Sequence, residues 1–431
     1  MSLTGLSIIF ILLFTLAETP VFTIIAALSI VLFYSVDFDF QALQTILIEM
    51  NRLASMPVLV VLPLFTLVGC ILTETPAPRR IMAMVQTLMG WLPGGLAIAA
   101  LVSCAFFTAL TGASGVTIVA LGSILYPILR QHQYDDVFSL GLVTTSGSLG
   151  LLFPPSLPVI LYGIVAQVDI GRVFRAALLP GIILVAVLSG YAVVHEILKK
   201  QSEKDRRSRE PFYLKKFLTA LWQGRWEWPI VLIIVVGVYG GFVTIAETSA
   251  LVLVYVIVVE CFVLKEIRFF RQLPEIMVEA GLFSGTIIVI LGMALGFTGY
   301  LVEEQIPNRI LELLTQLTKN RFIFLAGLNI FLLATGCIMD IFSAIIIIVP
   351  IIVPVAISYG IDPLHLGVIF LVNLEIGYST PPIGLNLFIS SLRFNKSIVT
   401  LYRASVPYLI LLLCVLMLVT YLPVISLWGR S

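Results

Sequence analysis

The chain has 431 residues, of which 60% are hydrophobic and 11% are charged, and its formal net charge is +1. A soluble globular domain is about 45–50% apolar and about 25% charged, so much of this protein must face lipid instead of water. The near-neutral charge gives no indication of nucleic-acid binding. The composition therefore predicts an all-α protein that crosses a membrane many times.

Two apolar segments open the chain, at 3–17 and 20–36, and each is near the length of a membrane-spanning helix. The first lacks the basic leading region of a signal peptide, so we expect a retained span. The first half then continues with a polar arm, a third span, an amphipathic stretch, a helical hairpin, an interrupted helix and a last span. We place these at 37–55, 57–74, 78–90, 96–129, 137–167 and 174–197.

A basic linker at 199–223 separates this half from a second half of the same plan. In the second half the corresponding elements are predicted at 227–242, 246–264, 265–277, 280–301, 307–319, 322–357, 364–392 and 400–425. The two helices of each hairpin meet at a tip of small residues, at 111–115 and 335–337. We expect each hairpin to be re-entrant, so that it returns to the side of the membrane from which it entered.

The two halves also resemble each other residue by residue at a nearly constant offset. At an offset of 227, Pro127 matches Pro354, the pair Pro154-Pro155 matches Pro381-Pro382, and Pro180 matches Pro407. Chance matches of proline are improbable, because only 22 residues are proline. With re-entrant hairpins each half crosses the membrane an odd number of times, so the repeats 1–198 and 224–431 are predicted to have inverted topology.

The positive-inside rule gives this arrangement an orientation. With the linker 199–223 in the cytoplasm, most of the 25 lysines and arginines lie on the inner side, and both termini lie outside.

Each half contains a Pro-Pro pair inside an apolar helix, which removes two amide donors and interrupts the helix. In hydrocarbon such unwound backbone is tolerated only where it is buried in protein or lines a polar cavity. Carbonyls at the end of the first half-helix suit a sodium ion, and amides at the start of the second suit a carboxylate. The alternative is a pair of proline kinks that only shape the bundle.

Two carboxylates are expected near membrane depth in the hairpin and interrupted-helix regions, Asp340 and Glu375. An intramembrane acid is a functional candidate, and Asp340 follows the second tip closely enough to face a cation. Glu375 has two interpretations, a site residue or an anchor for Asn373 or a backbone group. The first tip likewise has two, a ligand site or close helix packing through its glycines.

Motifs for other function classes are absent from the sequence. It contains no Gly-x-x-x-x-Gly-Lys-Ser/Thr run, so ATP is not the expected energy source. The three histidines are dispersed, and neither a His-Glu-x-x-His motif nor a Gly-x-Ser-x-Gly elbow is present. A membrane-embedded enzyme is therefore disfavoured, and a transporter is favoured over a channel because inverted halves with hairpins suit alternating access.

The two interrupted helices resemble those of the large permease subunit of TRAP (tripartite ATP-independent periplasmic) transporters, in the ion-transporter superfamily. The resemblance rests on the stretches 147–163 and 373–388, with Gly360-Ile361-Asp362-Pro363, and extends over nearly the whole chain. It implies sodium-coupled import of a carboxylate-bearing organic anion by an elevator mechanism. The implied substrate is a C4-dicarboxylate, a sialic acid or another sugar acid. The alternative is a binding-protein-independent, ion-coupled anion transporter or channel.

The resemblance also implies partners and a location. The partners are a small membrane subunit and a periplasmic substrate-binding protein, and the location is the cytoplasmic (inner) membrane of a bacterium or archaeon.

We predict one sodium site in each half, formed by backbone and hydroxyl oxygens. The candidate ligands are Thr111, Gly112, Ser114, Gly115, Ser146 and Gly150 in the first half, and Thr335, Gly336, Asp340, Gly377 and Thr380 in the second. The substrate is predicted to bind near Ser114, Pro154, Pro155, Ser156, Pro381, Pro382 and Asn386.

The binding protein must meet the outer face, which in this topology carries 37–55, 166–175 and 302–321. Mixed charges there suit a transient complex, because they fix its register and speed encounter. These charges are Asp37, Asp39, Arg52, Asp169, Arg172, Arg175, Glu303, Glu304, Arg309, Lys319 and Arg321.

Overall fold

The computed structural model describes residues 43–198, 224–381 and 383–428, with a few positions between 23 and 31 and between 218 and 222. The spans expected at 3–17 and 20–36, most of the linker 199–223, and Pro382 lie outside the described residues. Within the described ranges every regular element is a helix, which confirms the all-α prediction.

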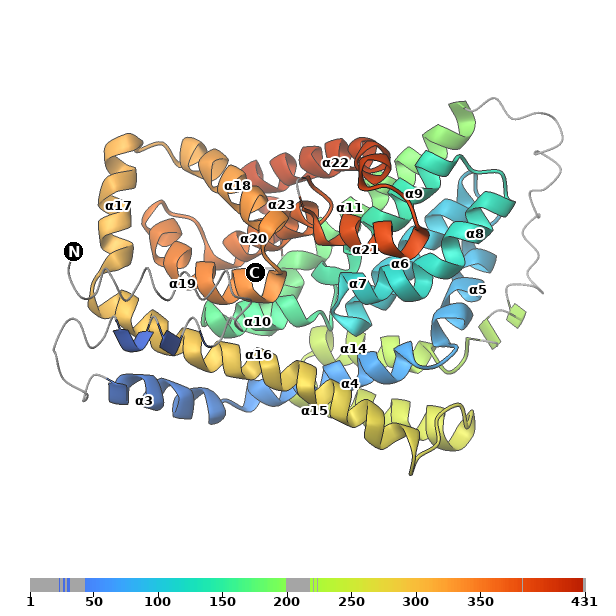
Figure 1. The fold of residues 1–431 in the computed structure, drawn as a ribbon, viewed down its shortest axis with the longest axis horizontal. Helices are drawn as coiled ribbons and strands as arrows, with labels where there is room; N and C mark the ends of the chain where they lie inside the picture. Colours follow the sequence, from blue (N-terminus) through green and yellow to red (C-terminus); the bar gives the residue numbers. More distant parts are fainter. Residues whose placement is uncertain are drawn as a thin grey trace.

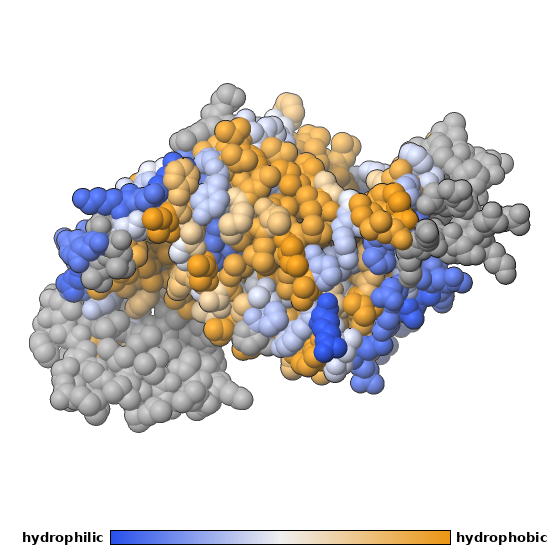
Figure 2. Space-filling model, turned by 90° about the horizontal axis from the view of Figure 1, so that it is seen from above, coloured by the Kyte–Doolittle hydropathy of each residue, from blue (hydrophilic) through white to orange (hydrophobic). Residues whose placement is uncertain are grey.

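Six described helices are long and apolar enough to cross a membrane, and two bent helix pairs raise the number to eight if each pair is one span. One bent pair is the interrupted helix of the first half, whose two parts meet at 45°. Apolar side chains cover the middle of the visible face, and hydrophilic ones gather toward its two ends (Figure 2). This is the surface expected of a protein with an apolar belt in lipid.

The first half follows the predicted order. Its elements are α3 (Leu43–Ala54), η2 (Pro57–Val60), α4 (Val61–Thr73), α5 (Ala77–Met89), α6 (Gly95–Thr111), α7 (Ser114–Thr117), η3 (Ile118–Gly122), α8 (Ser123–Gln131), α9 (Asp136–Ser146), η4 (Leu149–Leu152), α10 (Leu157–Val165) and α11 (Ile170–Leu198). The predicted hairpin 96–129 thus comprises α6 to α8, and the interrupted helix comprises α9, η4 and α10.

The second half has the same sequence of elements from α16 onward. Its elements are α14 (Trp228–Gly240), α15 (Ile245–Ile257), η5 (Val258–Val263), α16 (Gln272–Glu303), α17 (Ile306–Leu317), α18 (Arg321–Ile338), α19 (Ile341–Ser358), α20 (Pro363–Gly377), α21 (Leu385–Phe394), α22 (Ile398–Tyr421) and α23 (Val424–Leu427).

Two boundaries differ from the sequence interpretation. Much of the arm expected at 265–277 joins the span 280–301 in one helix, α16, of 32 residues. Pro274 lies in the first turn of α16, where its missing N–H interrupts nothing, whereas Pro57 follows the end of α3. The second tip also comes later than 335–337, because α18 continues to Ile338 and Asp340 caps α19.

The two amphipathic helices lie at opposite ends of the molecule (Figure 1). Helix α5 crosses one end and α17 crosses the other, each steeply inclined to the long helix α16. Helix α5 packs on α6 and α17 packs on α19, so each borders the hairpin of its own half. The hairpins therefore enter the bundle from opposite ends.

Candidate functional site

The first break separates α9 from α10. Asp135 starts α9 by accepting hydrogen bonds from the backbone N–H groups of Val137 and Phe138, at 3.1 and 3.4 Å. The helix ends at Ser146, a short turn follows at η4, and α10 starts after Ser156. Proline cannot donate to a helical ladder, so Pro154-Pro155 fixes the interruption here.

A pair of threonine hydroxyls joins the first hairpin to this break. The Thr108 hydroxyl donates to the Gly147 carbonyl oxygen at 2.8 Å and lies 2.7 Å from the Thr117 hydroxyl. Gly112 has a left-handed φ of +68°, and a side chain there would meet Leu157 at the start of α10. The tip of the hairpin therefore lies against the beginning of the second half-helix.

Gly150 permits the closest approach in this region. A Cβ atom on Gly150 would lie 2.1 Å from the Ala105 carbonyl oxygen and 2.5 Å from the Ala109 nitrogen. Both are backbone atoms of α6, which cannot move aside cheaply. The break and the first arm of the hairpin thus pack backbone against backbone.

The second break contacts its own hairpin in a different way. A Cβ atom on Gly377 would lie 2.6 Å from the Gly336 Cα atom in α18. The Gly384 N–H donates to the Cys337 carbonyl oxygen at 3.3 Å. The Tyr378 hydroxyl accepts a hydrogen bond from the Ile341 N–H at the start of α19.

The two breaks lie next to each other although they are far apart in the sequence. Helix α10 packs on α19, and α21 packs on α7 and η3, so each second half-helix contacts the hairpin of the other half. Gly115 in the first tip faces Ile389 of α21. The Ser148 hydroxyl lies 3.5 Å from the Glu375 carbonyl oxygen. Tips and breaks from both halves therefore form one central region.

The predicted sodium ligands of the first half lie in this region with different surroundings. Thr111 Oγ1 is buried and has no hydrogen-bond partner among the described residues, and Ser114 is only 3% exposed. The Ser114 carbonyl oxygen lies 3.2 Å from the position of a Cβ atom on Gly147. The Ser146 hydroxyl donates to the Val143 carbonyl oxygen, and Gly150 contacts α6 instead of the tip.

The predicted ligands of the second half divide into two groups. Gly336 and Gly377 are in backbone contact. The hydroxyls of Thr335 and Thr380 donate to carbonyl oxygens one turn earlier, at 2.9 and 2.7 Å, and keep lone pairs free. Asp340 is exposed, and one of its carboxylate oxygens accepts from two N–H groups of α19.

The residues predicted for substrate binding include two polar groups at equivalent positions of the two halves, each with an oxygen that lacks a hydrogen bond. Ser156 Oγ and Asn386 Oδ1 are both buried, and neither has a hydrogen-bond partner in the part of the chain that the structure describes. Ser156 precedes α10 and Asn386 lies in the first turn of α21, so each is at the N-terminus beyond a break. Buried polar groups are rarely left unpaired, so a ligand or water is expected there. Pro155 is buried, whereas Pro154 is half-buried and Pro381 is exposed.

Sequence reasoning missed three residues of the central region, Thr108, Thr117 and Tyr378. Thr108 lies three residues before Thr111, and Thr117 lies three residues after Ser114. Residues three apart share a helix face, so this spacing could have identified both hydroxyls. For Tyr378 the sequence offers no such signal, because its partner comes from another helix.

Glu375 does not anchor Asn373. The Asn373 amide donates to Asn329 Oδ1 and to the Ile369 carbonyl oxygen, both at 2.8 Å. Glu375 is fully buried, and no described residue forms a hydrogen bond with either of its carboxylate oxygens. Among the described residues no group of three or more His, Cys, Asp or Glu side chains could hold a metal ion.

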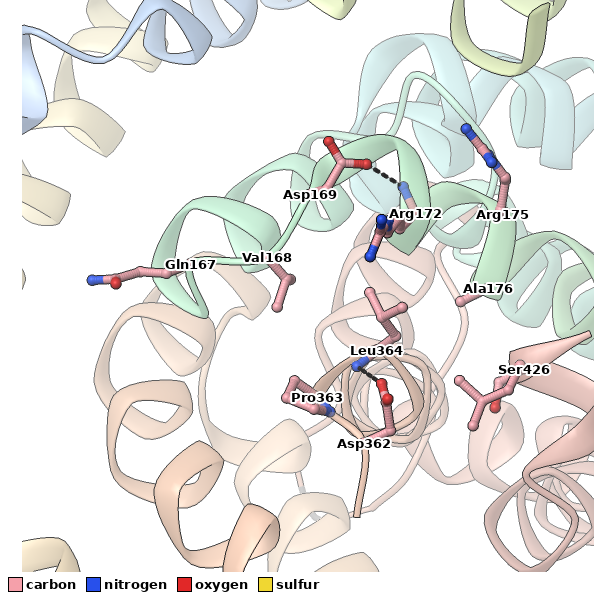
Figure 3. A pocket seen from close by; sticks show the side chains of 11 residues that line it. Gln167, Val168, Asp169, Arg172, Arg175, Ala176, Asp362, Pro363, Leu364 and Ser426 are labelled. Carbon is pink, nitrogen blue, oxygen red and sulfur yellow. Dashed lines mark hydrogen bonds between the residues drawn. The ribbon is translucent and has the colours of Figure 1, made fainter. Parts of the chain in front are cut away.

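Three of the charges predicted for docking lie together beside one cavity. The turn before α11, the start of α20 and α23 enclose a cavity of about 590 Å³, which Asp169, Arg172, Arg175 and Asp362 help to line (Figure 3). Arg309, in contrast, pairs with Glu304 at 3.4 Å on the surface near α17. The expected residues Asp37 and Asp39 lie outside the described residues.

Comparison with known proteins identifies the family. Residues 8–425 match the family described as "Tripartite ATP-independent periplasmic transporter, DctM component". The C4-dicarboxylate TRAP transporter large permease protein DctM of Pseudomonas aeruginosa is 34% identical over 90% of this chain and 90% of that protein. The isethionate TRAP transporter permease protein DctMQ of Oleidesulfovibrio alaskensis is 34% identical over 88% of this chain, which spans only 59% of that protein.

Two further similarities are more distant. The ectoine/5-hydroxyectoine TRAP transporter large permease protein UehC of Ruegeria pomeroyi is 27% identical over 86% of this chain and 86% of that protein. The crystal structure of the YdaH transporter of Alcanivorax borkumensis has a TM-score of 0.64 at 13% identity, covering 89% of each chain, which is a likeness of fold. This chain therefore belongs to the DctM family of large permease subunits of tripartite ATP-independent periplasmic transporters, and it is a multi-pass inner-membrane transport protein rather than an enzyme.

Proposed function

We propose that this permease subunit couples the import of a carboxylate-bearing organic anion to a sodium gradient. The observation that carries the proposal is the central region, in which two hairpin tips meet two helix breaks. Half-helix N-termini there offer amides to an anion, and tips and breaks offer oxygens to cations. Three buried oxygens without partners, on Thr111, Ser156 and Asn386, are groups that a bound ion and substrate would satisfy.

Sodium is proposed to bind at one site in each half. At the first, Thr111, Gly112, Ser114 and Gly115 would supply oxygens from the tip, and Ser146 and Gly150 would supply them from the break. At the second, Gly336, Gly377 and Thr380 would supply oxygens, with Thr335 and Asp340 at the edge. ATP has no proposed role.

The substrate class follows from the chemistry of the breaks together with the relatives. Relatives are named for C4-dicarboxylates, isethionate and ectoine. A site built from amides, hydroxyls and Asn386 suits a carboxylate without needing an arginine fork. We propose a C4-dicarboxylate first, and a sialic acid or another sugar acid as the alternative within the same class.

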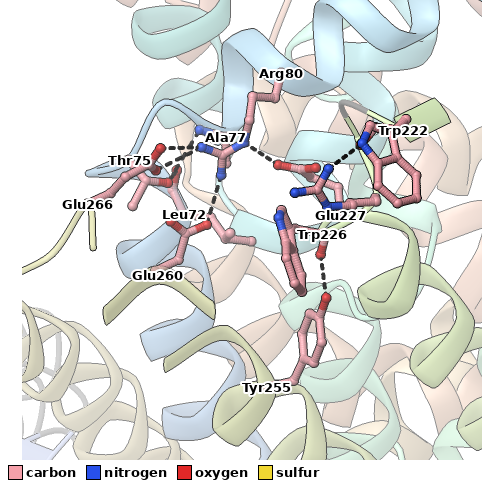
Figure 4. Close-up of polar contacts among 11 residues, drawn as sticks. Leu72, Thr75, Ala77, Arg80, Trp222, Trp226, Glu227, Tyr255, Glu260 and Glu266 are labelled. Carbon is pink, nitrogen blue, oxygen red and sulfur yellow. Dashed lines mark hydrogen bonds and ion pairs between the residues drawn. The ribbon is translucent and has the colours of Figure 1, made fainter. Parts of the chain in front are cut away.

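The transport cycle is proposed to be an elevator motion between two inverted repeats, 1–198 and 224–431. Hairpins and interrupted helices would move, and the remaining spans would form the scaffold. A polar cluster supports a fixed attachment for α5 (Figure 4). Arg80 of α5 binds Glu227 before α14, Glu260 of η5 at 2.9 Å and Glu266 at 2.6 Å.

This cluster joins the helix that leads into the first hairpin to the ends of two scaffold helices. Glu227 and Glu260 are each 3% exposed, so removal of Arg80 would leave buried carboxylates uncompensated. We propose that α5 stays with the scaffold while the hairpin moves.

The function is tested by reconstitution in liposomes with the proposed small membrane subunit and binding protein. Radiolabelled succinate uptake should saturate, require an inward sodium gradient and require the binding protein. N-Acetylneuraminate and isethionate are the competing substrates. Uptake without the binding protein would favour an independent anion transporter, and conductance at channel rates would replace the proposal with a channel.

Docking of the binding protein is proposed to use the outer-face charges. Reversing both Arg172 and Arg175, or both Glu303 and Glu304, should slow uptake at limiting binding protein, with partial recovery at excess, because such charges act mainly on encounter. Unchanged uptake at every binding-protein concentration in both double variants would place the docking surface elsewhere, for instance on the small subunit.

A further inference from the structure

The cavity at the outer end of α11 has an uneven charge balance. Arg172 and Arg175 are both exposed, and neither guanidinium forms a hydrogen bond or an ion pair with any described residue. The two carboxylates of the cavity, in contrast, are engaged at helix N-termini. Asp169 accepts from the Arg172 N–H, and Asp362 accepts from the Leu364 N–H, both at 2.8 Å (Figure 3).

An aspartate at a helix N-terminus is compensated by the helix amides and dipole. The two guanidinium charges have no such compensation among the described residues. The cavity therefore attracts anions, and low-dielectric walls strengthen this attraction.

Basic residues at the opposite end of the bundle, near α9 and α22, do have a carboxylate partner. Helix α22 packs on α9 there, as α11 packs on α20 at the outer end. Lys396 binds Asp136 at 2.9 Å, and Arg130 lies 3.5 Å from the same residue. The hydrogen bond to Asp136 raises the pKa of Lys396. The inner basic residues thus have a carboxylate partner, whereas the outer arginines do not.

The size and walls of the cavity suit a small organic ligand. Its volume of about 590 Å³ is within the range of small-molecule sites, roughly 300–1,000 Å³. Val168, Leu364 and Leu427 supply apolar wall, whereas the buried Ser426 hydroxyl is engaged with His365 and with the Pro423 carbonyl oxygen. Guanidinium groups bind carboxylates and sulfonates through paired hydrogen bonds.

We infer that the outer cavity is a second anion site, which takes a small organic carboxylate or sulfonate through Arg172 and Arg175 before it reaches the central region. The inference rests on the proposed function, since the ligand is the transported anion. The site needs no sodium, because no predicted sodium ligand lines the cavity. It raises the concentration of substrate at the outer face and leaves the later steps unchanged.

The test is equilibrium binding of radiolabelled succinate to the purified permease with its small subunit in nanodiscs, without sodium and without binding protein. The unchanged protein should bind succinate, with isethionate competing. Arg172→Gln combined with Arg175→Gln should weaken this binding at least tenfold. Arg309→Gln, on the outer surface but away from the cavity, is the matched control and should bind as the unchanged protein does. Arg175→Gln alone should give an intermediate affinity.

Uptake in liposomes separates the possible failures. If the inference is right, the double variant keeps its maximal sodium-dependent rate, and the succinate concentration for half-maximal uptake rises. Absence of sodium-free binding in the unchanged protein, or equal binding in the double variant, overturns the outer site. Unchanged sodium-free binding together with slower uptake in the double variant would assign the arginines to docking of the binding protein instead. Failure of the proposed function would instead appear as no sodium-dependent uptake by the unchanged protein.

Discussion

The two helix breaks come from matching stretches of sequence, yet they are held by different groups. At the first break, threonine hydroxyls connect the hairpin to the Gly147 carbonyl oxygen, and Gly150 packs on the backbone of α6. At the second, Gly336 packs on Gly377 and the Tyr378 phenol accepts from a hairpin amide. The first break is mostly buried, whereas Pro381 and Ile383 at the second are exposed.

This difference indicates that the repeat conserves an architecture and not a ligand set. The first tip has more hydroxyl oxygens within reach, and the second depends more on backbone and on one phenol. The sodium affinity of the proposed first site should therefore fall more than that of the second when a hydroxyl is removed.

The largest effect is expected from adding one methyl group to the first break. Gly150→Ala would place Cβ within 2.1 Å of a backbone oxygen of α6, so the break cannot keep its position. Overpacking of this kind costs about 1–3 kcal/mol or more, and we expect near-complete loss of uptake. Gly377→Ala, with 2.6 Å to Gly336, should be impaired but less severely. Uptake at matched membrane abundance is the measurement.

The matched control is Gly190→Ala, because no described residue would contact a Cβ atom within 4 Å at that position in α11. It should transport at the normal rate. Normal uptake by Gly150→Ala would show that η4 and α6 separate readily. The first break would then not be more tightly packed than the second.

A smaller effect is expected when the groups that tie hairpin to break are removed. Thr108→Val keeps the shape but leaves the Gly147 carbonyl oxygen without its donor. Tyr378→Phe leaves the Ile341 N–H without its acceptor. Each unpaired buried group costs about 1–3 kcal/mol, so thermal unfolding in detergent should shift downward in both variants.

Of the two variants, only Thr108→Val should also strongly raise the sodium concentration for half-maximal uptake, because Thr108 lies beside the hydroxyl-rich tip. Thr87→Val is its control, since that hydroxyl donates only to Ala83 one turn earlier. An equal sodium shift in Tyr378→Phe would contradict the proposed difference between the sites.

Substrate affinity should respond to the two unpaired groups beyond the breaks. Ser156→Ala and Asn386→Leu each remove one buried polar group that has an unpaired oxygen. Loss of one neutral hydrogen bond to substrate corresponds to about 0.5–1.5 kcal/mol, or roughly two- to tenfold in affinity. The succinate concentration for half-maximal uptake should rise, with sodium dependence unchanged. If only the sodium dependence changed, Ser156 and Asn386 would bind sodium and not the substrate.

The smallest effect is expected from single hydroxyls at the proposed sodium sites. Ser114→Ala and Thr380→Ala should each raise the sodium concentration for half-maximal uptake a few-fold, since carbonyl oxygens remain. The shift should be larger for Ser114→Ala if the first site depends more on hydroxyls. Wild-type sodium dependence in both variants would show that these hydroxyls are not ligands, although carbonyl ligation could persist.

Most element positions could be read from the sequence because they depend on local physics. Proline interrupted both helices, and apolar length defined spans such as α11 and α22. The misplaced boundaries have tertiary causes. Gly336 was expected in a turn, but its contact with Gly377 keeps it inside α18, and the turn moved to Asp340.

The candidate site could be predicted only in part for the same reason. The tips and breaks were identified, but Thr108 and Tyr378 acquire roles only through partners on other elements. The interpretation of Glu375 as an anchor for Asn373 was wrong, since Asn329 takes that role from 44 residues away. Arg172 and Arg175 were recognised as surface charges, but the cavity beside them depends on α20 and α23.

The sequence by itself determined the class of the protein, its helices, its two breaks and its family, because hydropathy, proline chemistry and motif identity are carried by neighbouring residues. The tertiary structure alone decided that both breaks and both tips share one region, and which oxygens there lack partners. It also decided that Arg130 and Lys396 have Asp136 as a partner, whereas the guanidinium groups of Arg172 and Arg175 have none among the described residues. Such pairing depends on distances between elements far apart in the chain, which local sequence does not encode.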